Sequence, residues 1–321
     1  MWTGPIGGRA IRIAARGSRV ACWYDFGMQA DPARTDAFEE YRELMFGIAY
    51  RMLGSVADAE DTIQETWLRW NQIDRGAVVD PRGYLVRAVT RTSIDQLRRA
   101  KARREQYIGS WLPEPLLTGP DSAEDVTRAD SVSMAILVML ERLSPLERAV
   151  FVLHEVFGFS YPEVAAVIDR SEAAVRQLGS RARGNVRGRP RFAANGKQIR
   201  QVTERFLAAC LGGDLGGLME LLAPDVTMWV DSNGRSEGGP REPVSGALPI
   251  AEYFASVAGR FPEGMRSRYV EFNGSGSGLF VVGDEVYAAF VLDFAEPDGR
   301  VEAIWVIREE GKLSRIRIPA D

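Results

Sequence analysis

The chain has 321 residues, 45% of them hydrophobic and 26% charged, and a formal net charge of −4. This composition is ordinary for a folded chain of two or three domains, and it excludes collagen-like and wholly disordered proteins. No apolar run is long enough to cross a membrane. The two cysteines, Cys22 and Cys210, lie far apart without metal-ligand spacing. We therefore expect no disulfide framework, no metal site and a reducing, cytoplasmic setting.

The net negative charge argues against nucleic-acid binding by the chain as a whole, but the basic residues are unevenly placed. Eight Arg or Lys residues lie between 82 and 104, and seven Arg lie between 170 and 191. Local basic stripes, rather than net charge, mark the surfaces that meet nucleic acid. The sequence therefore predicts two separate basic surfaces.

The N-terminal third predicts a poorly ordered leader followed by helices. Residues 1–33 contain four arginines and lack the apolar core of a secretory signal. Apolar residues then recur at helical spacing over 34–53, and Gly54 ends that helix. Ser55 begins the next helix, with Asp58 as its expected capping-box partner.

The second helix, over about 56–70, has one apolar and one acidic side. The acidic side carries Asp58, Asp61, Gln64 and Glu65. Two of these acids are explained by position alone, because carboxylates stabilise the N-terminus of a helix. The alternative is an acidic face that docks on a basic partner helix.

The third helix begins at Asp80-Pro81 after a loop over 71–80 and runs to about Arg104. Arginines surround its apolar positions, and Tyr84 adds an aromatic ring near the loop. Cations for phosphates beside aromatic rings suit single-stranded nucleic acid. The alternative is a solvated, arginine-rich helix end.

Residues 105–131 read as a linker, in which two prolines of the stretch 111–115 favour an extended path. The linker also contains Trp111 and Leu112, and we expect these two apolar side chains to pack against another part of the protein. The segment 132–190 then predicts a helical module. Its helices start at Ser144 and Ser160, each followed by Pro and Glu, and at Ser171.

The last two of these helices form a helix-turn-helix pattern, with Asp169 in the turn where such motifs usually carry Gly. Side chains on the final helix can reach base edges and phosphates. The alternative is a helical hairpin with a solvated basic face. After a short linker over 191–196, the chain predicts two helices and then strands, an α+β pattern. The expected strands are 226–230, 268–272, 279–282, 285–294, 302–308 and 313–318, with a helix over 250–261 between them.

These parts, in this order, resemble extracytoplasmic-function (ECF) sigma factors. Residues 58–70 resemble the helix of that family that binds core RNA polymerase, and residues 80–85 and 94–99 resemble its promoter −10 helix. The stretch from Leu143 resembles region 4, the −35 reader. Residues 197–321 are similar to SnoaL-like domains, which are cone-shaped α+β folds. A branch of the family carries such an extension together with the linker motif and an Asp-x-x-Gly-Lys/Arg motif.

The resemblance implies a multidomain chain with two all-α sigma modules, 34–104 and 132–190, followed by an α+β SnoaL-like domain. It implies no enzymatic activity and no cofactor, and the partners are core RNA polymerase (β′ clamp helices and β flap) and promoter DNA. The implied polymerase-binding residues are Asp58, Asp61, Gln64 and Glu65. The implied −10 residues are Arg82, Tyr84, Arg87, Arg91, Arg98 and Arg99. The implied −35 residues are Ser171, Glu172, Ala173, Arg176, Gln177, Ser180, Arg181 and Arg183. The implied regulatory residues are Trp111, Leu112, Pro113, Glu114, Pro115, Asp231, Gly234 and Arg235.

Arg91 departs from the family, which often has Asn there, and the C-terminal motif of the branch is altered. We expect the SnoaL-like domain to regulate the sigma modules in cis. The alternatives are a stand-alone helix-turn-helix regulator and a SnoaL-like isomerase or cyclase fused to a DNA-binding region. The candidate acids for such an enzyme are Asp225, Asp231 and Asp293, and the single histidine, His154, reads as a packed helical residue. A further alternative is that this domain binds an unidentified small ligand in a pocket lined by aromatic residues.

Overall fold

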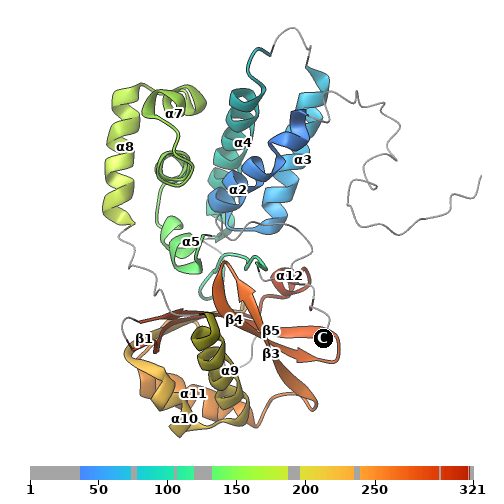
Figure 1. Ribbon diagram of the computed structural model, residues 1–321, viewed down its shortest axis with the longest axis vertical. Coiled ribbons are helices and arrows are strands. Elements are labelled where there is room, and N and C mark those ends of the chain that lie inside the picture. The colour runs from blue at the N-terminus through green and yellow to red at the C-terminus, as the bar shows by residue number, and fades with distance from the viewer. Residues whose placement is uncertain are drawn as a thin grey trace, which may run out of the picture.

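The computed structural model describes residues 37–73, 78–104, 107–118, 132–186, 196–234, 239–295, 298–316 and 318, with only the backbone over 101–104. The expected leader and Arg235 lie outside the described residues. Two helical modules stand side by side, and a domain that contains a sheet lies across their lower ends (Figure 1). We call them the first helical module (37–104), the second helical module (132–186) and the C-terminal domain (196–318).

The first helical module consists of a helical turn at 37–40 and three longer helices. Gly54 ends the first long helix in the left-handed conformation (φ 69°), as expected. Thr62 and Thr66 are buried on the next helix, and each hydroxyl donates to the carbonyl one turn earlier (2.7 and 2.8 Å). The helices are α2 (Arg42–Leu53), α3 (Val56–Gln72) and α4 (Pro81–Arg104).

Three helices of the second helical module begin at the serines that the sequence predicts. Ser144 and Ser160 form reciprocal capping boxes with Glu147 and Glu163, and Ser171 accepts from the backbone of Ala174. Its elements are α5 (Met134–Leu140), α6 (Pro145–Val150), a π-helical turn η5 (Phe151–Val156), α7 (Tyr161–Ile168) and α8 (Glu172–Asn185).

Asp169 ends α7 in the left-handed region, with φ 57° and ψ 59°. Glycine adopts this conformation freely, and aspartate is one of the few other residues that visit it routinely. The turn therefore keeps its geometry although the sequence lacks the usual glycine.

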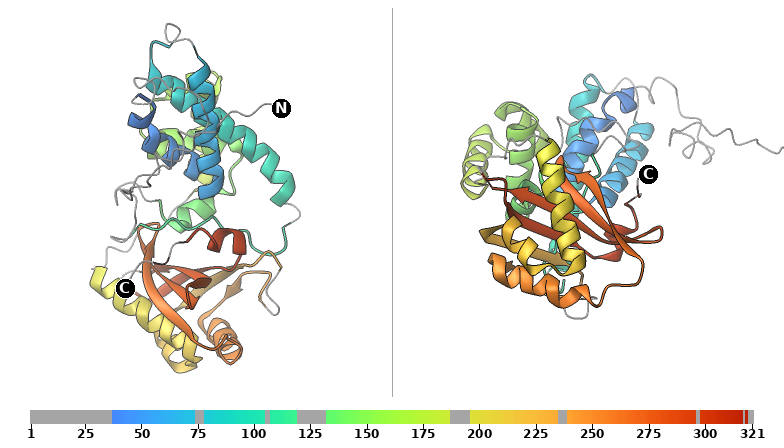
Figure 2. Two further views of the ribbon diagram at one scale, coloured as in Figure 1. Left: turned by 90° about the vertical axis from the view of Figure 1, so that its right-hand side faces the viewer. Right: turned by 60° about the horizontal axis from the view of Figure 1, so that its bottom comes forward.

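The C-terminal domain has three helices on one face of a six-stranded sheet (Figure 2). The strand order is β2-β1-β6-β5-β4-β3, with β1 and β6 parallel and the other pairs antiparallel. The helices are α9 (Gly196–Gly212), α10 (Leu215–Leu221) and α11 (Ala247–Ala258). The strands are β1 (Leu222–Asp231), β2 (Val244–Ser245), β3 (Met265–Phe272), β4 (Ser275–Val282), β5 (Glu285–Phe294) and β6 (Val301–Ile307).

Each face of this sheet is covered by a different part of the chain. One face packs on α9, α10 and α11, with Phe206, Phe254 and Phe290 in mutual ring contact. The opposite face packs on Leu112 of the linker and Met134 of α5. The two helical modules, in turn, share one continuous apolar cluster. The three parts are therefore joined by buried apolar contacts as well as by the chain.

Two sequence predictions for this domain are corrected by the structure. The strand expected over 313–318 is absent from its described part, where a short helix, α12 (Glu310–Leu313), forms instead because the Glu309 carboxylate caps it by accepting from the Lys312 amide (2.9 Å). The six aromatic residues considered as the lining of one small-molecule pocket are divided between the two faces of the sheet: Phe254, Phe280 and Phe290 lie on the helical face, and Trp229, Phe272 and Trp305 on the other.

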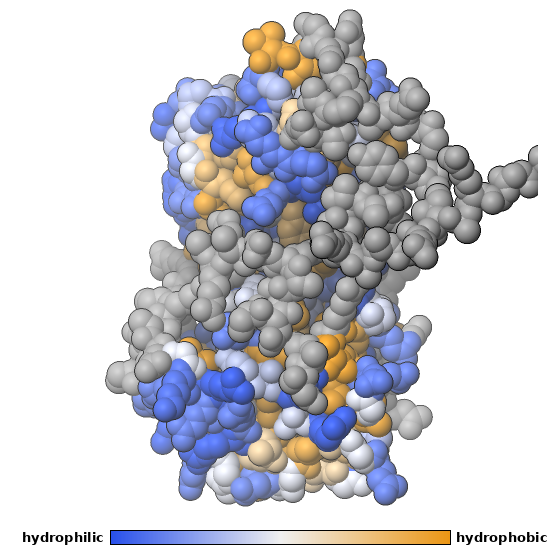
Figure 3. Space-filling view, turned by 45° about the vertical axis from the view of Figure 1, so that its right-hand side comes forward, coloured by the Kyte–Doolittle hydropathy of each residue, from blue (hydrophilic) through white to orange (hydrophobic). Residues whose placement is uncertain are grey.

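The described helices include none that is long and apolar enough to cross a membrane. In the view of Figure 3, hydrophilic side chains surround apolar areas on both halves of the molecule. One apolar area lies at the upper end, where α3 and α4 are joined, and Val79 just before α4 is 98% exposed. A fully exposed valine at this position has no role in packing the described residues.

Candidate polymerase and promoter interfaces

The acidic face of α3 is directed away from the core of its module. Asp61 and Gln64 are exposed, and Asp58 and Glu65 are half-buried. Glu65 forms an ion pair with Arg69 one turn later on the same helix. The opposite side of α3 is buried against α2 and α4 through residues such as Ala59, Ile63 and Trp70. The four predicted polymerase-binding residues therefore lie along the solvent side of one helix.

The predicted −10 residues line α4, but they differ in what they contact. Arg87 and Arg99 are exposed, and Arg98 is exposed and ion-paired with Asp95 (3.1 Å). Tyr84 is half-buried against the Trp70 ring, with 5.6 Å between centroids. These arginines therefore lie on the surface along α4, and the aromatic pair lies near its N-terminal end.

Two other arginines of α4 reach the second helical module. The Arg91 Nε donates to the carbonyl oxygen of Val167 (3.0 Å), in the last turn of α7. The Arg82 guanidinium lies over the Phe159 ring, 4.7 Å from its centroid. The last carbonyls of a helix lack helical donors and carry partial negative charge. The C-terminal end of α7 therefore attracts the positively charged Arg91 side chain. The sequence did not predict this contact.

The predicted −35 helix, α8, exposes the side chains of Gln177, Ser180 and Arg181. The Arg176 guanidinium donates to Glu172 through Nε and Nη2 (3.0 and 2.6 Å). Arg183 is bound outside α8, to Glu155 (2.6 Å) and the Tyr161 hydroxyl (3.0 Å). Ser171 serves as the N-cap, and Ala173 is exposed in the first turn. Among the described residues, Arg176 and Arg183 of α8 thus have side-chain partners, whereas Gln177, Ser180 and Arg181 are simply exposed to solvent.

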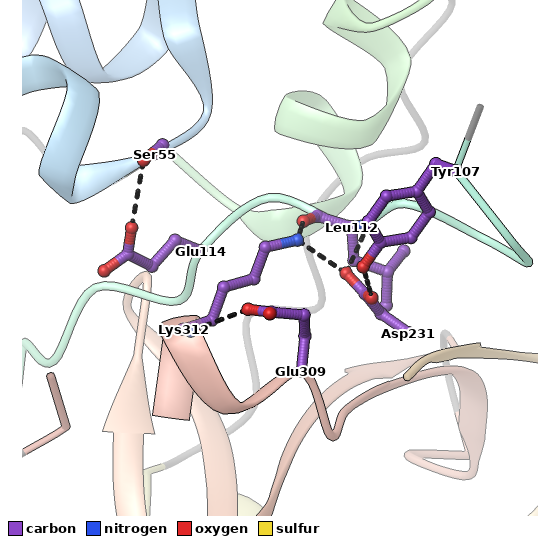
Figure 4. A network of polar contacts seen from close by, with 7 residues as sticks. All are labelled: Ser55, Tyr107, Leu112, Glu114, Asp231, Glu309 and Lys312. Carbon is purple, nitrogen blue, oxygen red and sulfur yellow. Dashed lines mark hydrogen bonds and ion pairs between the residues drawn. The ribbon is translucent and has the colours of Figure 1, made fainter. Parts of the chain in front are cut away.

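Asp231 binds the linker to the C-terminal domain in a contact that we call the linker clamp (Tyr107, Leu112, Asp231 and Lys312; Figure 4). The fully buried Asp231 carboxylate accepts from the Lys312 ammonium (2.6 Å), the Leu112 amide (2.9 Å) and the Tyr107 hydroxyl. Lys312 also donates to the Leu112 carbonyl (2.5 Å) and lies over the Trp111 ring, 4.4 Å from its centroid.

Burial governs the ionisation of the clamp. Desolvation lowers the pKa of Lys312, although the charge of Asp231 opposes this change. Desolvation and the bond to Asp231 both raise the pKa of Tyr107. A buried carboxylate is stable only if it is paired and hydrogen-bonded, and Asp231 has a cation and two further donors. The Lys312 ammonium thus gives the Asp231 carboxylate its cation, and burial makes this ion pair sensitive to loss of the lysine proton.

Glu114 connects the linker to the start of α3. Its carboxylate accepts from the Ser55 hydroxyl (3.1 Å) and from the amides of Val56 (2.9 Å) and Ala57 (3.3 Å). Ser55 caps α3 as predicted, because its hydroxyl accepts from the Asp58 amide (3.2 Å), and Glu114 adds an acceptor at the same N-terminus. Desolvation raises the pKa of Glu114, and these hydrogen bonds partly offset the increase. The linker carboxylate supplies the acceptor for the free amides of the predicted polymerase-binding helix.

Asn273 holds the next part of the linker from the end of β3. It is buried with a left-handed backbone (φ 53°). Its side-chain oxygen accepts from the Leu116 backbone N–H (3.1 Å), and its backbone N–H donates to the Leu116 carbonyl (2.8 Å). Its side-chain nitrogen donates to the Tyr50 hydroxyl (2.9 Å), which donates to the Glu114 carbonyl (2.8 Å). One residue therefore links the C-terminal domain, the linker and the first helical module.

Gly234 lies in a turn against the linker. Its φ is 71°, and a Cβ atom built there would come within 3.0–3.3 Å of Ile108. A side chain would be both strained and crowded at this position. The glycine of the Asp-x-x-Gly motif is therefore explained by a close approach of the linker.

Arg148 joins the two helical modules at the linker end. Its side chain is fully buried, with Nε donating to the Arg51 carbonyl (3.0 Å) and Nη1 to Glu141 (2.6 Å). Desolvation lowers its pKa to about 9. Gly54 lies beside it, where a Cβ atom would meet Glu141 and Trp111 at 3.1 Å. The linker and both helical modules thus converge at one turn.

Sequence reasoning missed Tyr50, Tyr107, Arg148, Asn273 and Lys312. None of them lies in a recognisable site motif, and each acts through a partner far away in the chain; Lys312 and Asp231 are 81 positions apart. The acids considered for catalysis do not converge: Asp225 is exposed, Asp231 is held by the clamp, and Asp293 is half-buried on β5. His154 donates from Nδ1 to the Phe159 carbonyl (2.7 Å) as a half-exposed helical residue. The described residues hold no group of three potential metal ligands.

Comparison with known proteins assigns the two helical modules. Residues 37–103 match the family Sigma-70 region 2, and residues 133–186 match Sigma-70, region 4. The chain therefore has the two conserved modules of a bacterial RNA polymerase sigma factor. Members of this class bind core RNA polymerase and promoter DNA, and they are not enzymes.

Full-length relatives define the family more narrowly. The ECF RNA polymerase sigma factor SigJ of Mycobacterium tuberculosis is 38% identical over 289 residues, which is 86% of this chain and 92% of SigJ. The probable ECF sigma factor SigI of the same species is 39% identical over 64% of this chain and 71% of its own length. The crystal structure of M. tuberculosis SigJ matches with a TM-score of 0.68 at 34% identity, covering 87% of this chain and 98% of that one. This chain belongs to the ECF RNA polymerase sigma factors, and its C-terminal domain is similar to that of SigJ.

Proposed function

We propose that α3 docks on the β′ clamp helices of core RNA polymerase, that α4 and the loop before it hold the −10 non-template strand, and that α8 reads the −35 duplex. The β flap would receive the second helical module. The observation that supports this assignment best is the solvent-facing acidic row of α3. Complementary charge fixes orientation and speeds association with a basic partner. The exposed Val79 next to the basic helix α4 suits the capture of an unstacked base.

Transcription with purified core polymerase tests the docking surface. Asp61→Lys with Glu65→Lys should abolish core binding and promoter-specific transcripts, because both changes oppose a basic partner. The matched control is Asp225→Lys with Asp284→Lys, which reverses two exposed acids of the C-terminal domain. If the α3 double variant still binds core polymerase as the control does, this docking face is excluded.

We further propose that the C-terminal domain modulates promoter output in cis through the linker clamp and through Glu114. The support is geometric: Glu114 caps α3, and the same linker is held two residues earlier by Asp231 and Lys312. A change in the C-terminal domain can therefore reach the polymerase-binding helix and the spacing of the two helical modules. An unidentified small ligand of this domain would act along the same route.

The clamp is best tested in the full chain. Lys312→Met leaves the buried Asp231 carboxylate without its cation, which costs about 3–5 kcal/mol when a buried ion pair loses one partner. We expect release of the linker, seen as faster proteolysis within 107–118, and a changed transcript yield at equal core occupancy. Arg205→Met, an exposed ion-pair residue of α9, is the control. Unchanged yield and unchanged core affinity, despite a released linker, would exclude regulation through the clamp.

A further inference from the structure

Tyr161 is the first residue of α7, directly after the Ser160 cap, and it contacts the predicted recognition helix at three points. The Arg176 guanidinium lies over its ring, 4.5 Å from the centroid. Its hydroxyl accepts from Nη1 of Arg183 (3.0 Å). Its ring edge faces Gly179, where a Cβ atom would stand 3.6 Å from Cε1. These three residues lie one and two turns apart, so they share one face of α8.

The tyrosine ring is itself held by the preceding turn of the module. The His154 ring stacks on it, with centroids 4.0 Å apart and an interplanar angle of 28°. The Nδ1–H of His154 donates to the Phe159 carbonyl (2.7 Å), which fixes the imidazole. Glu155, the next residue, binds Arg183. The support for Tyr161 therefore comes from η5 and the turn before α7, not from α8 itself.

The contacts of Arg176 restrict its orientation but leave part of it free for DNA. Glu172 occupies the edge formed by Nε and Nη2, and the tyrosine ring covers one face. The Arg176 side chain is 59% exposed, and its Nη1 has no partner among the described residues. Guanidinium edges of this kind bind the two acceptors of guanine in the major groove. An arginine that is already ordered loses less rotamer freedom when it binds.

Arg183 differs from Arg176 in this respect. Both of its partners, Tyr161 and Glu155, lie outside α8, and both raise its pKa through hydrogen bonds. The arginine therefore ties the C-terminal half of α8 to the rest of the module. This contact suits a structural tie better than the reading of a base.

We propose that Tyr161 is a positioning residue for promoter recognition, which holds the Arg176 guanidinium in the orientation that reads one base pair of the −35 element. Arg183 acts with it by fixing α8 against α7. The inference rests on the proposed role of α8 as the −35 reader. It adds a specificity role for a residue outside the recognition helix.

Holoenzyme transcription from a promoter library with a randomised −35 region tests this role, because the library samples every base at each position. The base preference at each position is read from the transcripts of the wild type, Tyr161→Phe, Tyr161→Leu and Arg176→Ala. Arg176→Ala should lose its preference at one position by on the order of tenfold. Tyr161→Leu should lose much of the preference at that same position, whereas Tyr161→Phe, which retains the ring, should keep it.

A merely structural role of Tyr161 gives a different pattern. In that case Tyr161→Leu would lower transcription evenly across the library and leave the preference at the Arg176 position intact, and the proposal would be overturned. Thermal unfolding of each variant identifies loss of folding, and Tyr161→Trp provides a second aromatic rescue that should restore the preference. If Arg176→Ala itself alters no position selectively, then the assignment of Arg176 as a base reader fails, independently of Tyr161.

Discussion

Among the arginines that cross between the two helical modules, Arg148 and Arg91 lie in different environments. Arg148, at the linker end, is 1% exposed and donates to a backbone carbonyl and to Glu141. Arg91, on the helix that we assign to the −10 element, is exposed and makes one hydrogen bond, to the end of α7. A buried charge without a partner is costly, whereas an exposed one is readily satisfied by water or phosphate.

This difference suggests which end of the module contact is fixed and which end can open. The linker end also carries the clamp and Asn273, so three buried polar contacts hold it together. The opposite end is held by Arg91 and by Arg82 over Phe159, both exposed arginines. DNA phosphates can therefore compete for the arginines of α4 without disturbing the buried end.

The largest expected effect is at Arg148. Arg148→Met removes the ion pair with Glu141 and the buried donor to the Arg51 carbonyl, so the free energy of unfolding should fall by about 3–5 kcal/mol. Urea denaturation of the full chain measures this loss. Arg142→Met, at an exposed position of the same module, is the control and should change stability by less than about 0.5 kcal/mol. Equal stability of the two variants would remove the distinction between the buried and exposed ends.

A smaller effect is expected at Asn273, where two contributions can be separated. Asn273→Gly keeps the left-handed backbone but loses the side-chain hydrogen bonds to the Leu116 amide and the Tyr50 hydroxyl, which should cost about 1–3 kcal/mol. Asn273→Ala loses these bonds and also strains the backbone, by roughly a further 1 kcal/mol. The denaturation midpoints of the two variants measure these losses, and the alanine variant should have the lower midpoint. An alanine variant as stable as the glycine variant would exclude a backbone contribution.

The contribution of Glu114 to the stability of the folded chain should depend on pH. Its pKa is raised above 4.5 in the folded chain, so the folded state keeps a proton that the unfolded state has lost. Stability from this residue is therefore full below pH 4.5 and declines as pH rises through the raised pKa. The stability of the wild type relative to Glu114→Gln should fall over this window and then level off. Thermal unfolding at several pH values measures the difference, and a rise with pH would contradict the assignment.

The smallest effect is expected at Arg91. Arg91→Ala removes one part-buried hydrogen bond from an exposed side chain, so the unfolding free energy should change by about 1 kcal/mol. The separation of α4 from α7, followed by fluorescence transfer between labels on the two helices, should nevertheless increase. Arg87→Ala, an exposed neighbour on the same helix, is the matched control. If both variants leave the separation unchanged, Arg91 does not hold this end closed.

Local signals in the sequence predicted most of the helices and strands. The Ser-x-x-Glu patterns at 144 and 160 placed two helix starts, and both form the expected capping boxes. The strand over 285–294 was predicted with its full bounds. The strand over 313–318 was predicted wrongly, because Leu313, Ile316 and Ile318 suggested a strand, whereas Glu309 caps a short helix that ends at Leu313. Periodicity alone could not detect that cap.

The sequence by itself determined the order of the modules, their caps and the family, because these depend on residues a few positions apart. Only the tertiary structure decided the partners of Asp231 and Glu114. Asp231 binds Leu112 across 119 positions, and Glu114 binds Val56 across 58. Such pairs form only when the sheet and the helical modules bring distant segments together, and burial then makes each polar contact obligatory. The physical reason is thus the range of the interaction. Hydrogen bonds between residues a few positions apart can be predicted from short sequence patterns, whereas buried bonds between distant residues cannot.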